Sequence, residues 1–194
     1  MTFLGVIFDM DGTITAPYLR FADIKDRAGI GDRDLLEYLD TAQGAERERV
    51  ARLLAEFEED GAANARLNRG ARTVLSFLKR KRIPTGLLTR NSRRSVELVC
   101  RKLALKFDVT ASREDAPSKP APEAIWQMTR RWGIRPEQAL MVGDYKWDIL
   151  CAQNAGARSA VLVNGAGVPA WAQEADYIIE RLTALLPIVE GRER

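Results

Sequence analysis

Acidic residues follow short apolar runs at two distant points in the sequence, and this arrangement constrains the fold more than any other feature. Asp9 and Asp11 follow the run Val6-Ile7-Phe8, and Asp144 follows the run Ala139-Leu140-Met141-Val142 after a single glycine. Continuous apolar runs of this length are typical of strands buried in a parallel sheet. The acids therefore mark the carboxyl ends of strands, which form the edge where open α/β sheets bind ligands.

Carboxylates gathered at this edge need a compensating cation. Two like charges ~4 Å apart repel by ~4 kcal/mol at an effective dielectric constant of 20. A set of carboxylate oxygens favours a hard cation such as Mg²⁺, which keeps several water ligands and also binds substrate phosphate. The pattern of Asp9, Asp11 and Asp144 therefore predicts a Mg²⁺ site and indicates metal-assisted phosphoryl transfer.

The composition excludes several other kinds of active site. The chain has no histidine, which rules out a Ser-His-Asp or Cys-His relay and any zinc site that uses histidine. Two cysteines, Cys100 and Cys151, are too few for a cysteine-based zinc cluster, and we expect both to pack as small apolar residues. A disulfide between them is not excluded by the sequence. However, the lack of a signal peptide or a cysteine framework favours a cytoplasmic protein, in which cysteines stay reduced.

Length and charge are those of an ordinary globular protein. The 194 residues, of which 46% are hydrophobic, suffice for a substantial core with an insertion. No apolar run approaches the ~20 residues of a membrane span. The net charge is +3, and the basic run Lys79-Arg80-Lys81-Arg82 follows the helical pattern Val74-Leu75-Phe77-Leu78. Cations are typical of a helix C-terminus, so this run does not lead us to expect nucleic-acid binding. The lack of an apolar span leads us to expect no membrane partner.

Strand and helix patterns alternate along most of the chain, but the segment after the first strand is purely helical. Helices are predicted within it at residues 19–28, 32–39 and 45–59. The later alternation predicts strands near residues 85–88, 107–110, 139–142, 160–163 and 177–179, with helices beginning after residues 70, 91, 121 and 145. The sequence thus predicts a doubly wound parallel α/β sheet, formed by residues 1–16 and 67–194, with a small all-helical insert at 17–66.

Two further segments offer phosphate ligands at the same edge of the sheet. Thr89 follows the strand at 85–88, and the amides after it lead into a helix N-terminus, which attracts anions. Lys119 stands just before the helix that begins near Pro122, and it has a compact positive charge. Each signal is weak by itself, because strand-end threonines often cap helices and most lysines are solvated. Their order in the sequence relative to the aspartates makes Thr89 and Lys119 candidate phosphate ligands.

The chain resembles the haloacid dehalogenase superfamily of phosphohydrolases, whose four motifs are matched in order by Asp9-Met10-Asp11-Gly12-Thr13, Thr89, Lys119, and Gly143-Asp144 with Asp148. The resemblance covers essentially the whole chain and implies a Rossmann-like core. The insert is similar to the small helical (C1-type) cap of this superfamily. The segment Lys119-Pro120-Ala121-Pro122-Glu123 is similar to the phosphoglycolate-phosphatase-like branch.

The resemblance implies a role for each acidic residue. Asp9 would be the nucleophile that forms an aspartyl-phosphate. Asp11 would protonate the leaving oxygen, so its pKa must lie above that of Asp9; neighbouring negative charge would raise it, while Mg²⁺ and Lys119 keep Asp9 ionised. Asp9, the backbone carbonyl of Asp11, and Asp144 would hold Mg²⁺. Asp148 would orient a metal-bound water or Lys119.

The resemblance also implies that Thr89 and Lys119 bind the transferring phosphoryl oxygens. Further candidates for phosphate or substrate contacts are Met10, Gly12, Thr13, Arg90 and Asn91. Arg90 stands where relatives often have asparagine, and its guanidinium could bind a second substrate anion or have a structural role. Arg20, Lys25 and Arg27 of the insert could contact the leaving group or be solvated.

Together these features predict a Mg²⁺-dependent phosphomonoesterase that acts on a small phosphorylated metabolite, with phosphoglycolate among the compatible substrates. The acid at position 11 disfavours dehalogenation. One alternative is a phosphomutase of the same superfamily, which the absence of histidine disfavours. Another is a catalytically silent binding protein, which has little physical reason to gather Asp9, Asp11, Lys119 and Asp144. Monomer and homodimer are both open.

Overall fold

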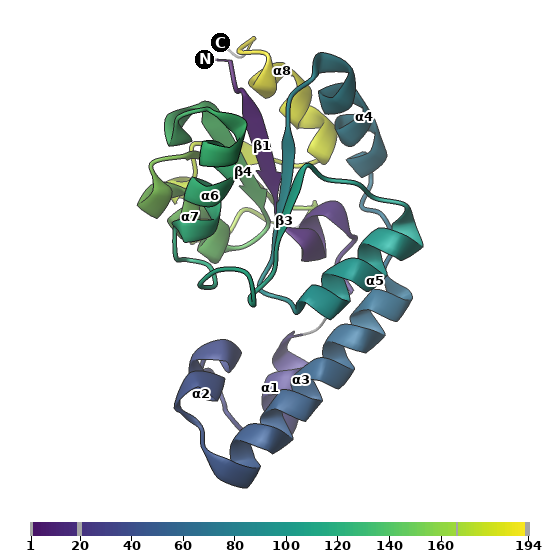
Figure 1. Ribbon diagram of the computed structural model, residues 1–194, viewed down its shortest axis with the longest axis vertical. Helices are drawn as coiled ribbons and strands as arrows, with labels where there is room; N and C mark the ends of the chain where they lie inside the picture. The colour runs from purple at the N-terminus through teal and green to yellow at the C-terminus, as the bar shows by residue number, and fades with distance from the viewer. Residues whose placement is uncertain (1, 19–20, 166, 193–194) are drawn as a thin grey trace.

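The computed structural model describes residues 2–18, 21–165 and 167–192 and contains a single six-stranded sheet with helices around it (Figure 1). All neighbouring strands are parallel, in the order β3-β2-β1-β4-β5-β6. This confirms the predicted doubly wound sheet. The strands are β1 (Gly5–Phe8), β2 (Thr85–Leu88), β3 (Val109–Ala111), β4 (Ala139–Gly143), β5 (Arg158–Leu162) and β6 (Tyr177–Ile179).

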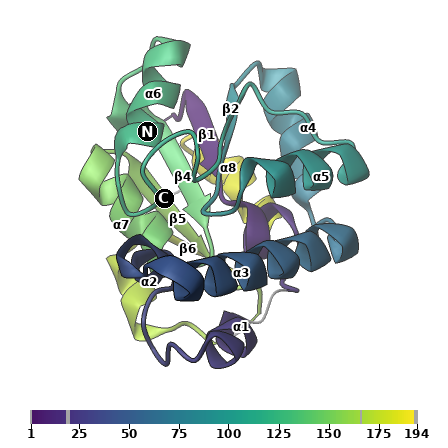
Figure 2. The ribbon, with the colours of Figure 1, turned by 60° about the horizontal axis from the view of Figure 1, so that its bottom comes forward.

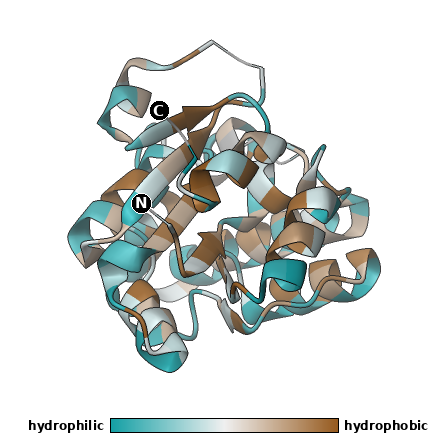
Figure 3. Cartoon of the chain, turned by 90° about the horizontal axis from the view of Figure 1, so that it is seen from above, coloured by the Kyte–Doolittle hydropathy of each residue, from teal (hydrophilic) through white to brown (hydrophobic). Residues whose placement is uncertain are grey.

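Helices cover both faces of the sheet, because successive residues of a strand point to opposite faces. Val6 and Phe8 of β1 pack with one group of helices, α4 (Ala71–Lys81), α5 (Arg93–Leu103) and α8 (Leu185–Val189). Ile7 points the other way and packs with α6 (Glu123–Trp132) and α7 (Lys146–Ala155). Figure 3 shows this distribution, with largely hydrophobic strands inside and hydrophilic residues on the outer faces of the helices.

The strand register aligns the segments that carry the sequence motifs. Phe8, the last residue of β1, pairs with Leu87 of β2 on one side and with Val142 of β4 on the other. The chain leaves all three strands at the same edge, so the residues that follow them are brought together. Asp9, Thr89 and Asp144 therefore begin the loops of three neighbouring strands.

The helices of the insert, α1 (Phe21–Ala28), α2 (Leu35–Thr41) and α3 (Gly44–Asn64), lie together beyond that edge (Figures 1 and 2). They bury a separate apolar cluster that includes Ile24, Leu39 and Val50. The last part of α3 lies alongside α5 of the core, where Arg94 contacts Glu59 at 2.7 Å. The separate cluster supports the division into a core (1–16 and 67–194) and a cap (17–66), which stays a prediction.

Predicted and observed boundaries differ at a few points. Helix α3 continues to Asn64 rather than ending near residue 59, because its last turns pack along α5. Strand β3 begins at Val109, two residues later than predicted. The short helix α8 had no periodic signal, and residues 19 and 20 of the first predicted helix lie outside the described residues.

Two smaller expectations are met. The basic run ends α4, where Arg82 closes the helix in a left-handed conformation. Cys100 and Cys151 are both free thiols, and burial raises the pKa of Cys151 to about 12. Among the described residues, no helix is both long enough and apolar enough to span a membrane.

Candidate active site

Lys119 lies at the centre of the candidate site, between two carboxylates. Its ammonium group donates hydrogen bonds to Oδ1 of Asp9 and to Oδ1 of Asp148, each at 2.6 Å. All three side chains are buried, with Lys119 only 4% exposed. A buried ammonium between two carboxylates is stabilised by both, so this side chain is fixed in charge and position.

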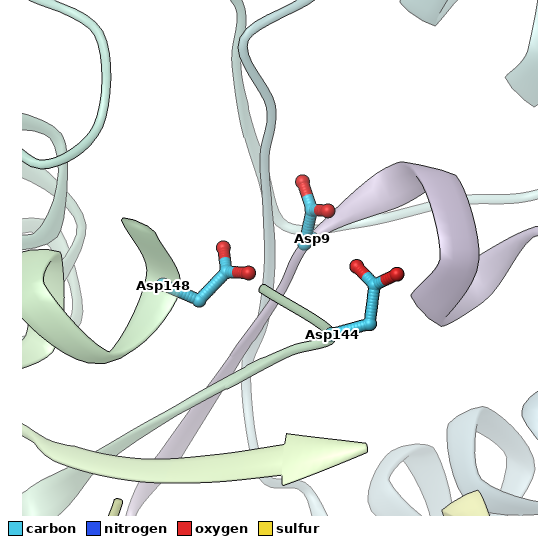
Figure 4. Close-up of side chains that lie close together, drawn as sticks. All are labelled: Asp9, Asp144 and Asp148. Carbon is cyan, nitrogen blue, oxygen red and sulfur yellow. The ribbon is translucent and has the colours of Figure 1, made fainter. Parts of the chain in front are cut away.

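Asp9, Asp144 and Asp148 form a compact acidic cluster, and Figure 4 shows their carboxylates turned toward one another. One oxygen from each lies within 4.8 Å of the others. Gly12 packs directly against this cluster, because a Cβ added to it would lie 2.0 Å from Oδ2 of Asp144. An all-oxygen donor set held this closely fits a hard divalent cation such as Mg²⁺.

The predicted third ligand, Asp11, lies beside this cluster, and its carboxylate has other partners. Oδ2 of Asp11 accepts a hydrogen bond of 2.6 Å from Asn91, and Oδ1 accepts one of 3.3 Å from Thr15. The side chain of Asp11 is thus held away from the acidic cluster, which is compatible with metal binding through its backbone carbonyl. Asp148 takes the third place among the clustered carboxylates.

Burial dominates the electrostatics of the acids. Burial raises the pKa of Asp144 to about 7, and the charge of Asp148 adds to the effect. Burial also raises the pKa of Asp9 well above its ordinary value, against the opposing effect of Lys119. The pKa of Asp11 is raised for the same reason, so burial rather than neighbouring charge is the main cause. Although burial opposes its charge, Asp148 and Asp9 raise the pKa of Lys119.

Asp148 reaches the site because Gly143, against which it packs, has no side chain. Its carboxylate packs so tightly against Gly143 that an added Cβ would lie 2.0 Å from Cγ of Asp148. Oδ2 of Asp148 accepts a hydrogen bond of 3.1 Å from the backbone N–H of Tyr145, at the start of α7. The other oxygen accepts a hydrogen bond from Lys119, so Asp148 is placed to orient that lysine, and its role stays a prediction.

Thr89 and the candidates for phosphate contacts lie around the same position. Thr89 is 3% exposed, and its hydroxyl accepts a hydrogen bond of 3.2 Å from the N–H of Asn91. The hydroxyl of Thr13 lies 3.5 Å from Oδ1 of Asp144. Met10 is fully buried in the core, so its side chain does not face the site and only its backbone can contact a ligand.

A cleft of about 610 Å³ connects these residues with the helical insert. Its lining includes Asp9, Asp11 and Lys119 at one end and Lys25 of α1 at the other. Arg27, on the same helix, does not line the cleft; its guanidinium lies 3.8 Å from Glu56. Arg20 lies outside the described residues.

Arg90, whose role the sequence leaves open, is paired with a residue of the insert. Its two terminal nitrogens bind the two oxygens of Asp34 at 2.6 and 2.8 Å. Asp34 also caps α2 by accepting hydrogen bonds from Leu36 and Glu37. Although burial opposes ionisation, the hydrogen bonds and charge of Arg90 lower the pKa of Asp34. In this structure, Arg90 therefore joins the core to the insert.

Sequence reasoning did not single out several residues at the site. Glu58 of α3 is 3% exposed, lines the cleft and pairs with Arg113 of the core. Trp147 also lines the cleft, and Asn68 and Asn164 hold the turn that follows β1. Two signals were available: the turn-forming pair Asn164-Gly165 follows a predicted strand, and Trp147 lies between Asp144 and Asp148. Glu58 and Asn68 had none, because their contacts join residues far apart in the sequence.

Comparison with known proteins identifies the family of this chain. A family model described as haloacid dehalogenase-like hydrolase matches residues 3–156. A haloacid dehalogenase-like hydrolase domain-containing protein of Arabidopsis thaliana is 30% identical over 172 residues, which cover 81% of this chain and 70% of the relative. Pyrophosphatase PpaX of Bacillus cereus is 34% identical over 122 residues, which cover 60% of this chain and 56% of that protein.

Among solved structures, a predicted phosphoglycolate phosphatase from Haemophilus somnus superposes with a TM-score of 0.77 at 21% identity. The match covers 96% of this chain and 97% of the other, so the two proteins share the same overall fold. The family model covers most of the chain, with all four motifs within its limits. The chain belongs to the haloacid dehalogenase-like hydrolase family.

Proposed function

We propose that this protein is a Mg²⁺-dependent phosphatase that removes the phosphoryl group from a small phosphorylated metabolite through an aspartyl-phosphate on Asp9. The observation that carries the proposal is the position of Lys119, whose ammonium binds the Asp9 carboxylate in a cleft that also contains Asp11 and Thr89. A nucleophile, a proton donor and two phosphate ligands are the parts that this chemistry needs.

In the first step, a carboxylate oxygen of Asp9 forms a bond to phosphorus while the bond to the leaving oxygen breaks. Asp11, whose pKa is raised by burial, gives its proton to that oxygen. In the second step, Asp11 takes a proton from water, which attacks phosphorus and releases Asp9. Lys119 and the hydroxyl of Thr89 hold the phosphoryl oxygens in both steps.

The acidic cluster would hold Mg²⁺, with Asp9 and Asp144 as side-chain ligands and Asp11 contributing its carbonyl. When bound, Mg²⁺ neutralises the charge of these carboxylates and of the phosphoryl group. It would also return Asp9 to the ionised form, which burial alone disfavours. The Lys119 contact of Asp148 supports a role in positioning that lysine.

The test is a panel of phosphorylated metabolites assayed for phosphate release with and without Mg²⁺. Because relatives have the names pyrophosphatase and phosphoglycolate phosphatase, the panel includes pyrophosphate and phosphoglycolate. We expect Mg²⁺-dependent release by the parent protein and none above background by Asp9→Asn. Asp108→Asn is the matched control, since Asp108 binds Thr85 at the opposite end of β2.

Two results would contradict the proposal. Release that survives in Asp9→Asn would exclude Asp9 as the nucleophile, and release that is unchanged by chelation of Mg²⁺ would exclude the metal. A sugar bisphosphate assayed for isomerisation tests the mutase alternative: we expect inorganic phosphate and no isomer. The absence of histidine supports this expectation.

A further inference from the structure

Two asparagine side chains converge on one backbone carbonyl next to the candidate metal site. The amide nitrogen of Asn164 lies 2.7 Å from the carbonyl oxygen of Gly12, and that of Asn68 lies 3.1 Å from the same oxygen. Asn68 also donates a hydrogen bond of 2.9 Å to the side-chain oxygen of Asn164. We call these two residues the Gly12 clasp.

The carbonyl that the clasp holds belongs to the turn that carries the catalytic acids. Gly12 has a φ of +72°, and its Cα faces Asp144 so closely that a Cβ would lie 2.0 Å from a carboxylate oxygen. Thr13, the next residue, contacts the other oxygen of Asp144 at 3.5 Å. The orientation of the Gly12 peptide therefore determines how closely this turn approaches Asp144.

The two halves of the clasp come from different parts of the fold. Asn164 follows β5 and has a φ of +51°, a left-handed conformation that asparagine tolerates better than most residues. Asn68 lies on the segment that returns from the helical insert, where its N–H donates to the carbonyl of Ile14 at 2.9 Å. Thr15 and Leu67 pair one residue further along. The clasp thus joins the turn to the sheet and to the returning segment.

We propose that Asn68 and Asn164 are positioning residues, which fix the Gly12 peptide and so hold the turn of Asp11 in register with Asp144 for cation binding. This inference rests on the proposed function, because it assumes that Asp11 and Asp144 bind the same cation. Neither asparagine lines the cleft. Each acts through the Gly12 carbonyl, and their effects should not add because they share that acceptor.

The sharpest variant is Asn164→Asp, which keeps the shape and the left-handed tolerance of asparagine but loses the amide donor. Asn164→Gly provides the same test without the added charge, and Asn68→Ala removes the other half of the clasp. The matched control is Asn64→Ala, because Asn64 also donates its amide to a carbonyl, that of Asp60, but lies at the end of α3.

The first measurement is hydrogen exchange of residues 10–15 in the metal-free protein. We expect faster exchange in the three clasp variants than in the parent or Asn64→Ala. Hydrogen exchange at the rate of the parent in all three variants would overturn the proposed positioning role of the clasp. Because no metal is present, this measurement is independent of the proposed phosphatase activity.

The second measurement is the affinity for Mn²⁺, a paramagnetic substitute for Mg²⁺, determined by electron paramagnetic resonance. We expect about tenfold weaker Mn²⁺ binding in Asn164→Asp and Asn164→Gly, because Gly12 directly follows Asp11, whose carbonyl would bind the cation. This is the lower end of the range for groups that orient metal ligands. The value of kcat should fall with it while KM changes little. Mn²⁺ affinity equal to that of the parent in both variants would overturn the link to cation binding, and Asp9→Asn separately reports on catalysis.

Discussion

The ammonium group of Lys119 lies 2.6 Å from Oδ1 of Asp9 and the same distance from Oδ1 of Asp148. This ammonium is the nearest compensating charge for the acids at the site. Lys119→Met keeps the length of the side chain but removes the charge, so we expect kcat/KM to fall by about 100-fold or more. Lys106→Met, on an exposed surface, is the control. Steady-state kinetics that agree for parent and Lys119→Met would contradict the assigned role.

Asp11 should matter most for substrates whose leaving oxygen needs a proton. General acid catalysis typically contributes about 10²- to 10⁴-fold. We therefore expect Asp11→Asn to lose activity on that scale with alkyl phosphates, and much less with p-nitrophenyl phosphate, whose leaving group departs without protonation. A comparison of kcat/KM for the two kinds of substrate checks this. Equal losses for both would show that Asp11 is not the proton donor.

Gly12 should not tolerate a side chain, for two separable reasons. Gly12→Ala places a methyl group against Asp144 and also puts alanine at a positive φ, which costs about 1–2 kcal/mol. Gly156→Ala has the same backbone cost, since Gly156 has a φ of +74° but no neighbour within 4 Å of an added Cβ. In chemical denaturation, both variants should lose free energy of unfolding because alanine is placed at a positive φ. Gly12→Ala should lose more, because its methyl group also meets Asp144. A smaller loss in Gly12→Ala than in Gly156→Ala would be contrary to the observed packing.

Metal affinity should rise with pH through neutrality. In the metal-free protein, burial and the charge of Asp148 raise the pKa of Asp144 to about 7, so below that pH a proton must leave before a cation can bind. We expect the apparent affinity for Mg²⁺ to fall up to about tenfold per pH unit below 7 and to level off above it. Isothermal titration calorimetry in buffers of different ionisation enthalpy measures both the affinity and the proton release. A constant affinity between pH 6 and 8 would contradict this assignment.

The same shift predicts the sign of a stability change. A carboxyl group whose pKa is higher in the folded than in the unfolded protein favours folding while it is protonated. The metal-free protein should therefore lose stability as the pH rises from about 4 through 7, and Mg²⁺ should restore it. Thermal unfolding at pH 6 and pH 8, with and without Mg²⁺, provides the comparison.

The Arg90–Asp34 pair should couple the insert to the core. Asp34→Asn keeps a good helix cap but removes the charge, and Arg90→Met removes the guanidinium. Because the pair is bidentate and partly buried, a double-mutant cycle on unfolding should give a coupling energy of about 1 kcal/mol. Arg90→Met should also affect all substrates alike. A larger loss for substrates with a second anionic group would instead favour a role for Arg90 in substrate binding.

Much of the fold was predictable from local patterns. The apolar runs before Asp9 and Asp144 mark strands that are buried on both faces, and the spacing of Val50, Leu54 and Phe57 marks a helix with one apolar face. The limits of elements were less predictable where packing extends them, as in α3. A short helix such as α8 has too few turns to show a period.

Asp9, Thr89 and Asp144 were identifiable because each directly follows a strand. Asp11, Lys119 and Asp148 were identifiable from their order and spacing relative to these residues. The partners of these residues were not, because the contacts are distant in sequence: Asn164 lies 152 residues from Gly12. The proximity of Asp148 to Lys119 depends in addition on a glycine at position 143, whose lack of a side chain leaves room for the carboxylate. A contact that depends on packing in this way cannot be recognised from the sequence alone.

Helix α3 is long, and it contacts the core mainly near its C-terminal end. Its 21 residues correspond to about 31 Å, and only its last turns rest on α5. A tilt of about 10° at this base would move the opposite end, near Gly44, by about 5 Å over a rod of that length. A tilt of this size away from the core would widen the cleft mouth by more than the diameter of a water molecule. It would also have to break the Arg90–Asp34 pair, which joins the insert to the core away from α5.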